Sequence, residues 1–176
     1  LHDFLLPHYP LLVNEFPKVR FHLEARSSRE VVDSILTNHS DIGLVINPVE
    51  YSSLMIRPLI ATKALFYSEE KEVKRYYLNP QMVDLNKFLK IIRKEFLDES
   101  HIHFIDDYDL IAHLVKTRSG CGLLPHHVGE RFKLKIHHGT SSAYKMNYDL
   151  KLVSSAVSKS EKKRQIMRRL ELLIRK

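Results

Sequence analysis

The sequence predicts an α/β protein of two lobes joined by two crossing strands, and three observations lead to this fold class. Short apolar runs typical of strands alternate along the chain with runs of helical spacing, which is the order of a layered α/β protein. A strand–helix–strand set occurs twice, on either side of the charged stretch 69–75. A final strand and helix then return, with no internal repeat or long linker between the elements.

The first part of the chain predicts two helices and three extended segments. In order, these are a helix over Phe4–Phe16, a strand over Val19–Ala25, a helix over Arg29–Asn38, a strand over Asp41–Ile46 and an extended segment over Met55–Tyr67. Pro7 suits a first helical turn, where no amide donor is needed. Val19–Ala25 alternates apolar and polar residues, as a strand does. Ser27 with Glu30 three residues later predicts a capping box at the second helix.

The second part predicts short strands separated by helices. The strands are Tyr76–Leu78, Ile102–Ile105, Cys121–Leu124, Leu134–Ile136 and Leu150–Val157, and the helices are Met82–Phe96, Asp106–Arg118, His126–Phe132 and Lys159–Lys176. Asn79 and Pro80 end the first of these strands. Asp106 and Asp107 suit a helix start, because acidic residues there complement the helix dipole.

This order of elements predicts the lobes. Lobe I comprises residues 1–66 and 149–176, and lobe II comprises residues 67–148. The two crossings are expected near Leu65–Ser68 and Met146–Lys151. A ligand in such a protein binds in the cleft, where strands end and helices begin.

Composition limits the class of protein. With 44% apolar and 28% charged residues, the 176-residue chain is expected to be globular. Its net charge of +7 gathers partly in Lys159–Lys176, around an apolar stripe, which favours a docked helix with a solvated charged face over a nucleic-acid surface. No apolar run is long enough to span a bilayer, and the single Cys121 cannot form an internal disulfide, so we expect a cytoplasmic protein. A start at Leu1 rather than Met suggests a piece of a longer protein.

Motifs for catalysis, metals and cofactors are missing from the sequence. There are eleven histidines, but no HExxH motif and no Cys/His cluster, so we expect no metal site. No G-x-S-x-G elbow or dinucleotide fingerprint occurs. Adjacent acids such as Asp106 and Asp107 define no acid–base geometry. The sequence therefore predicts no catalytic residues, no cofactor and no enzyme.

Three stretches carry a resemblance to a known family. They are Leu5-Leu6-Pro7 with Phe16-Pro17-x-Val19, then Glu24 to Ser28 followed by Asp41 to Ile46, and finally Val115 to Pro125 with its Gly120-Cys121-Gly122 centre. Together they resemble the effector-binding domain of LysR-type transcriptional regulators, which has the type 2 periplasmic-binding-protein fold. The chain departs from that pattern in three ways: the family's first strand is absent, the segment Glu69–Pro80 is contracted, and Arg118 replaces a glycine.

The resemblance and the strand-end positions together give the candidate effector-binding residues, which are Ser27, Ser28, Asn47, Pro48, Asn79, Gln81 and Gly120. Ser27 and Ser28 lie at a strand-to-helix turn, where hydroxyl and amide donors suit an anion. Ser27 also reads as an ordinary N-cap. Asn47-Pro48 and Asn79-Pro80 are also typical of ordinary turns, in which these residues need no ligand.

The resemblance implies a sensing domain that binds a small molecule, with an anion among the candidates. It also implies a homodimer or homotetramer, with helices Phe4–Phe16 and Asp107–Arg118 near the interface, and contact with DNA only through a helix-turn-helix domain outside this chain. Three alternatives remain: a solute-binding protein of a transporter, an enzyme on the same two-lobe scaffold, and a basic nucleic-acid module that uses Lys159–Lys176.

Overall fold

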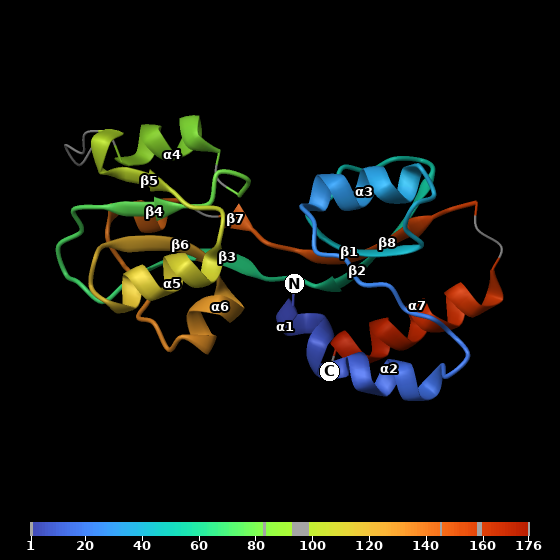
Figure 1. The fold of residues 1–176 in the computed structure, drawn as a ribbon. Helices are drawn as coiled ribbons and strands as arrows, with labels where there is room; N and C mark the ends of the chain where they lie inside the picture. Colours follow the sequence, from blue (N-terminus) through green and yellow to red (C-terminus); the bar gives the residue numbers. More distant parts are fainter. Residues whose placement is uncertain (1, 83, 93–98, 145, 158–159, 176) are drawn as a thin grey trace. The chain divides into compact units, whose positions relative to one another are not determined.

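The computed structural model describes residues 2–82, 84–92, 99–144, 146–157 and 160–175. The chain forms two compact units (Figure 1). Unit 1 comprises Leu1–Ala61 and Asp149–Lys176, and unit 2 comprises Thr62–Tyr148. The chain therefore leaves unit 1 once and returns to it once, and each unit has its own sheet.

The sheet of unit 1 has three strands in the order β1-β8-β2, and both pairs are antiparallel. The strands are β1 (Ile42–Ile46), β8 (Leu150–Ser155) and β2 (Leu54–Ile60). Helix α3 (Ser28–Leu36) covers one face, while α2 (Tyr9–Glu15) and α7 (Glu161–Ile174) cover the other (Figure 1). Each face has its own apolar cluster, because neighbouring residues of a strand point to opposite faces.

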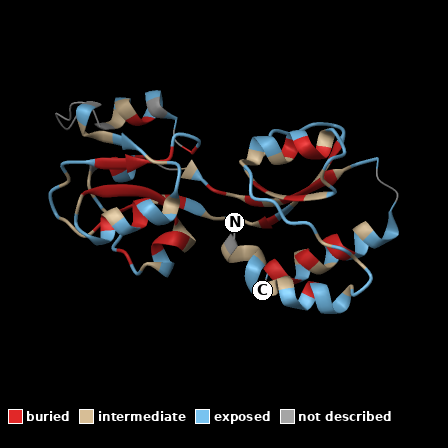
Figure 2. Ribbon diagram, viewed as in Figure 1, coloured by how far each residue is buried: buried red, intermediate tan, exposed pale blue. Residues whose placement is uncertain are grey.

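Helix α7 confirms the predicted amphipathic pattern. Its residues Ile166, Leu170, Leu173 and Ile174 are buried against the sheet. The basic residues Lys162 and Arg168 are exposed on the opposite side, as the alternation of red and pale blue along this helix shows (Figure 2). Much of the chain's positive charge is therefore the solvated face of a docked helix.

The sheet of unit 2 has five strands in the order β5-β4-β6-β3-β7. These strands are β3 (Lys63–Ser68), β4 (Tyr76–Leu78), β5 (Ile102–Phe104), β6 (Cys121–Pro125) and β7 (Met146–Asn147). Strand β4 is parallel to both β5 and β6, whereas β3 is antiparallel to β6 and β7. The carboxyl ends of β4, β5 and β6 therefore lie at one edge of this sheet.

Helices cover both faces of the unit 2 sheet. One apolar cluster joins α5 (Tyr108–Lys116) and α6 (His126–Arg131) to the strands. On the other side, Phe66 of β3 stacks on Phe88 of α4 (Leu85–Ile92) with ring centroids 5.5 Å apart. Tyr144 packs edge-on against both rings, just after the short 3-10 helix η4 (Thr140–Ala143). Another 3-10 helix, η3 (Glu99–His101), precedes β5.

Most predicted elements are confirmed within a few residues, one predicted helix is divided into three parts, and two predicted strands are wrong. The helix predicted over Phe4–Phe16 consists of α1 (His2–Leu5), the 3-10 helix η1 (Leu6–His8) and α2. Prolines at the starts of η1 and α2 fit this division, because proline has no N–H to donate within a helix. The ends of the predicted helices Met82–Phe96 and Lys159–Lys176 lie outside the described residues.

Val19–Ala25 is not a strand, because it pairs with no other backbone segment among the described residues. Its alternation reports one packed face, since Val19 and Phe21 contact the apolar cluster of unit 1, but a strand also needs a neighbouring backbone. Leu134–Ile136 is not a strand either: only Ile136 forms a bridge, to Tyr67, so the segment adjoins β3 too briefly for a ladder.

Candidate functional site

The amino end of α3 and the carboxyl end of β1 are fastened together in unit 1. The Ser28 hydroxyl accepts a hydrogen bond from the backbone N–H of Ile46 at 2.9 Å. Asn47 follows with a positive φ of 43°, its side-chain oxygen accepts from Asp149 N at 3.0 Å, and its own N–H donates to Asp149 O at 3.1 Å. Ser27, Ser28, Asn47 and Pro48 are therefore brought to one edge of unit 1.

Ser27 forms the predicted capping box. Its backbone N–H donates to the Glu30 carboxylate at 2.9 Å, its hydroxyl donates to the same oxygen at 2.6 Å, and Glu30 N donates back to the hydroxyl oxygen at 3.4 Å. These bonds lower the pKa of Glu30, so its carboxylate is charged at neutral pH. The backbone N–H groups of Ser28 and Arg29 have no partner among the described residues, which leaves two donors at this helix end.

Asn79 lies at the carboxyl end of β4 in unit 2 and is buried. Its amide nitrogen donates to Asp106 O at 3.0 Å, and its side-chain oxygen accepts from Gln81 N at 2.9 Å. The side chain therefore joins the loops that follow the parallel strands β4 and β5. Its polar atoms are committed to this turn, whereas the Gln81 side chain is exposed.

Gly120 lies apart from Asn79 and Gln81. It precedes β6, at the amino rather than the carboxyl end of that strand. Its φ is 155°, and a Cβ there would lie 2.6 Å from Arg75 O, whose carbonyl accepts a hydrogen bond from Cys121 N at 2.9 Å. The close approach of the Arg75 backbone explains why a residue without a Cβ occupies position 120.

His126 follows the third parallel strand, β6, and belongs to a hydrogen-bonded set. Its Nδ1 lies 2.7 Å from the hydroxyl of Tyr67, and its Nε2 lies 3.4 Å from the Glu130 carboxylate. Burial, helped by the Glu130 charge, raises the pKa of Tyr67 to about 12, so this hydroxyl stays protonated. Gly129 makes room for the tyrosine, because a Cβ there would lie 2.2 Å from its ring.

Two tyrosines stand near these strand ends. The ring of Tyr148 packs edge-on against Tyr108 at 6.3 Å and lies 6.0 Å from the ring of His127. The Tyr108 hydroxyl lies 3.7 Å from Met82 Sδ, and burial raises its pKa. Neither His126 nor His127 was among the predicted effector-binding residues. Their position after the strand-ending Pro125 was a usable signal, whereas nothing local marked the tyrosines.

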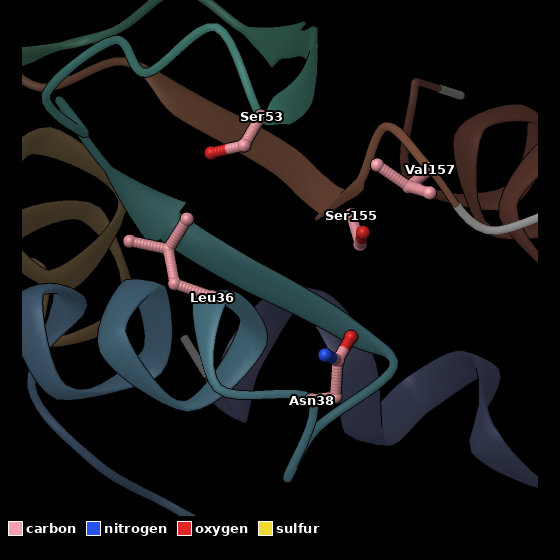
Figure 3. Close-up of a pocket in the computed structure, with 5 residues that line it drawn as sticks. All are labelled: Leu36, Asn38, Ser53, Ser155 and Val157. Carbon is pink, nitrogen blue, oxygen red and sulfur yellow. The ribbon is translucent and has the colours of Figure 1, made fainter.

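A hollow of about 470 Å³ opens at the other end of unit 1 (Figure 3). It is lined by Leu36, Asn38, Ser53, Ser155 and Val157, from the end of α3, the start of β2 and the end of β8. The Val157 side chain is 77% exposed. This lining holds no charged group and none of the predicted site residues, so the candidate site is placed at the Ser28–Ile46 edge instead.

Among the described residues, no group of three or more His, Cys, Asp or Glu side chains could hold a metal ion. No helix in the described part of the chain is both long and apolar enough to cross a membrane. Cys121 is buried and free of disulfides.

Comparison with solved structures gives close matches of fold over nearly the whole chain. The regulatory domain of HypT from Salmonella typhimurium in a bromide-bound form has a TM-score of 0.73 and 13% identity, over 99% of this chain and 90% of that chain. The regulatory domain of MetR from N. meningitidis, a LysR family regulator, has a TM-score of 0.69 and 16% identity, over 99% and 87%. This chain has the fold of LysR-family regulatory domains.

A sulfate-bound variant of the OxyR2 regulatory domain from Vibrio vulnificus matches at a TM-score of 0.65 and 13% identity, over 98% of this chain and 88% of that chain. The predicted type 2 periplasmic-binding-protein-like fold and the resemblance in fold are thereby confirmed. Comparison of the sequence with protein-family models and with curated proteins gives no match. At sequence identities of 13–16%, the likeness to these domains shows that the fold is shared and no more.

Proposed function

We propose that this chain is the ligand-sensing regulatory domain of a LysR-type transcriptional regulator. The observation that carries the proposal is the likeness of fold to LysR-family regulatory domains over nearly the whole chain. A DNA-binding helix-turn-helix domain outside residues 1–176 would then read the DNA. The effector acts on it only if the effector binds one conformation of the regulator more tightly than another.

The proposed effector is a small anion. Its main contacts are the unpartnered N–H groups of Ser28 and Arg29, at the positive end of α3. The structures of HypT and the OxyR2 variant that share this fold contain bromide and sulfate, respectively. Because Glu30 already places one carboxylate at this helix end, we expect a monoanion to bind better than a polyanion.

Within unit 2, the residues proposed to contact an effector lie at its own strand ends. Gln81 is exposed after β4, and His126 follows β6 with its ring held by Tyr67 and Glu130. Asn79 has a supporting role, because its side chain holds the Gln81 loop.

Thermal unfolding tests the proposal against a panel of bromide, sulfate, small carboxylates and amino acids. A ligand at about one hundred times its Kd stabilises the folded state by about 2.7 kcal/mol. For a chain of this length that raises Tm by roughly 5–10 °C. We expect a selective, saturable rise with at least one monoanion. No rise with any compound would count against an effector site.

Ser27→Ala and Ser160→Ala form a matched pair for this experiment. Both hydroxyls cap a helix: Ser27 caps α3, and Ser160 accepts from Lys163 N at 3.3 Å at the start of α7. Each variant should lower the free energy of unfolding by about 1 kcal/mol. Only Ser27→Ala should also reduce the ligand-induced rise in Tm, because only α3 has its amino end at the proposed site.

The remaining parts of the proposal concern partners and location. We propose a cytoplasmic homodimer or homotetramer without catalytic activity. Exposed apolar side chains on the predicted interface helices support the oligomer: Leu11 of α2 is 49% exposed and Leu110 of α5 is 51% exposed. The buried Cys121 and the high pKa of Tyr67 argue against either as an activated nucleophile.

A further inference from the structure

The hollow of about 470 Å³ in unit 1 has a lining that suits a ligand of a different kind from the proposed anion (Figure 3). Its volume lies within the range of about 300–1,000 Å³ that is usual for small-molecule sites. Two of its lining residues are apolar and three are polar without charge: Leu36 and Val157, then Asn38, Ser53 and Ser155. Apolar walls with a few polar groups between them are typical of sites that bind small molecules.

The sheet of unit 1 holds one side of the hollow in place. Ser155 is the last residue of β8, and it lies opposite Leu54, the first residue of β2, in the antiparallel register. Just beyond this pair, Ala156 N donates a hydrogen bond to Ser53 O at 2.8 Å. Leu54 is itself buried in the apolar cluster that α3 forms with the sheet. Ser53 and Ser155 therefore lie on adjoining strand ends whose backbones are fixed.

The carboxyl end of α3 forms another side of the hollow. Leu36 is the last residue of this helix and packs against the same apolar cluster. Asn38 follows with a positive φ of 59°, and its N–H donates to Ile35 O at 3.1 Å, as is common where a helix ends. The next N–H, that of His39, donates to Ser34 O at 2.8 Å. These bonds fix the backbone that carries the Asn38 amide group.

The polar side chains around the hollow are available to a ligand. Among the described residues, the side chains of Asn38, Ser53 and Ser155 form no hydrogen bond. Asn38 and Ser53 are exposed, so a ligand can reach them from solvent. A serine hydroxyl both donates and accepts, and an asparagine amide offers two donors and an acceptor. Ligand hydroxyl groups have the same two capacities, so they can pair with all three side chains.

The electrostatics of the hollow disfavour a charged ligand. The carboxyl end of α3 lies there, and the negative end of a helix dipole repels an anion. A cation would find no carboxylate among the lining residues to pair with. Contact with the apolar side chains of Leu36 and Val157 would also remove water from a charged group, which is costly without a partner. An uncharged ligand avoids all three penalties.

We propose that this hollow is a second binding site of unit 1, for an uncharged cyclic polyol such as a monosaccharide. The apolar walls, Leu36 and Val157, would contact the C–H groups of the ring. Asn38, Ser53 and Ser155 would hydrogen-bond with its hydroxyl groups. The site is separate from the one proposed for the anion, because the two lie at opposite ends of α3. The polyol therefore binds whether or not the anion does.

An NMR titration that follows the backbone amides tests this proposal residue by residue. The probes are glucose and myo-inositol. Glucuronate and glucosamine are the charged comparisons, because they carry a carboxylate and an ammonium group on a similar ring. We expect at least one of the two probes to shift the amides of Asn38, Ser53 and Ser155 saturably, with a Kd on the order of millimolar for so small a ligand. The charged comparisons should bind about tenfold more weakly than glucose.

Three variants check which side chains hold the probe. Asn38→Gly removes the amide group and introduces a residue that readily adopts a positive φ. Ser53→Ala removes one lining hydroxyl. Each change should weaken binding about fivefold, the usual effect of losing one hydrogen bond. Ser52→Ala removes the neighbouring exposed hydroxyl, which does not line the hollow, and should leave the Kd unchanged.

The outcomes that would overturn the proposal are distinct. One is that neither probe shifts the three amides saturably. Another is that glucuronate or glucosamine binds as tightly as glucose. A third is that Ser52→Ala weakens binding as much as Ser53→Ala. Amide shifts of unit 2 that are the same in every variant without a probe would show that each variant is folded.

Discussion

The hydroxyl of Ser28 and the backbone N–H of Ile46 form a 2.9 Å hydrogen bond that joins the start of α3 to the end of β1. This bond connects residues eighteen positions apart, so it fixes the helix end relative to the strand end. The donors proposed to bind the effector, the N–H groups of Ser28 and Arg29, are held by the same bond.

Ser28→Ala removes this acceptor and leaves the Ile46 N–H unpaired in a partly buried place. We expect the free energy of unfolding to fall by about 1–2 kcal/mol. Urea unfolding measures this change. Ser52→Ala, at an exposed serine of the β1–β2 connection, is the control and should stay within about 0.5 kcal/mol of the original protein. Equal losses in both variants would show that the bond adds nothing.

Gly129→Ala should destabilise unit 2 through overpacking. The new Cβ would lie 2.2 Å from the Tyr67 ring, which is only 1% exposed. We expect a loss of about 1–3 kcal/mol in thermal or urea unfolding. Gly139→Ala is the matched comparison, because its Cβ would meet the ring of His137, which is partly exposed and can rotate away. Its cost should be clearly smaller, and the opposite order would contradict the packing seen here.

Tyr67→Phe should change how stability depends on alkaline pH. The folded-state pKa of Tyr67, about 12, lies above the ordinary value of 10, so its contribution is complete below pH 10 and is lost as pH rises through 12. The variant lacks this group, and its stability should fall less between pH 10 and pH 12. Urea unfolding of both proteins across that range provides the measurement. Parallel curves would refute the assigned shift.

Leu11→Asp should weaken self-association if α2 lies at the subunit interface. Leu11 is 49% exposed, and burying a charge in an apolar contact is costly. Sedimentation velocity should show a dimer or tetramer for the original chain and a smaller species for the variant. Leu172→Asp changes a comparable exposed leucine on α7 and should not alter the assembly. A monomeric original chain would argue against the proposed oligomer.

Local patterns predicted much of the fold correctly. The Ser27–Glu30 capping box depends only on a three-residue spacing, and it is present as expected. The apolar stripe of α7 likewise repeats at helical spacing, and it is buried. Val19–Ala25 misled the prediction, because alternation along one segment cannot reveal whether another backbone lies beside it.

The candidate site was predicted less completely, because the order of the strands in each sheet, and not the spacing along the chain, brings its residues together. Asn79 and Asp106 are joined by a hydrogen bond only because β4 and β5 are parallel neighbours. The same arrangement places His126 at the end of the next strand, β6, and leaves Gly120 at the opposite end. None of these pairings leaves a mark in the spacing of nearby residues.

The sequence by itself determined the helices, most strands, the helix caps and the two-lobe α/β class, since these follow from short-range spacing and side-chain chemistry. Tertiary structure alone decided that the Ser28 hydroxyl accepts a hydrogen bond from Ile46 N and that the Tyr67 hydroxyl lies beside His126 Nδ1. These relationships join residues far apart in the chain. They depend on how strands are ordered and packed, which is settled by the burial of whole apolar faces rather than by any local pattern.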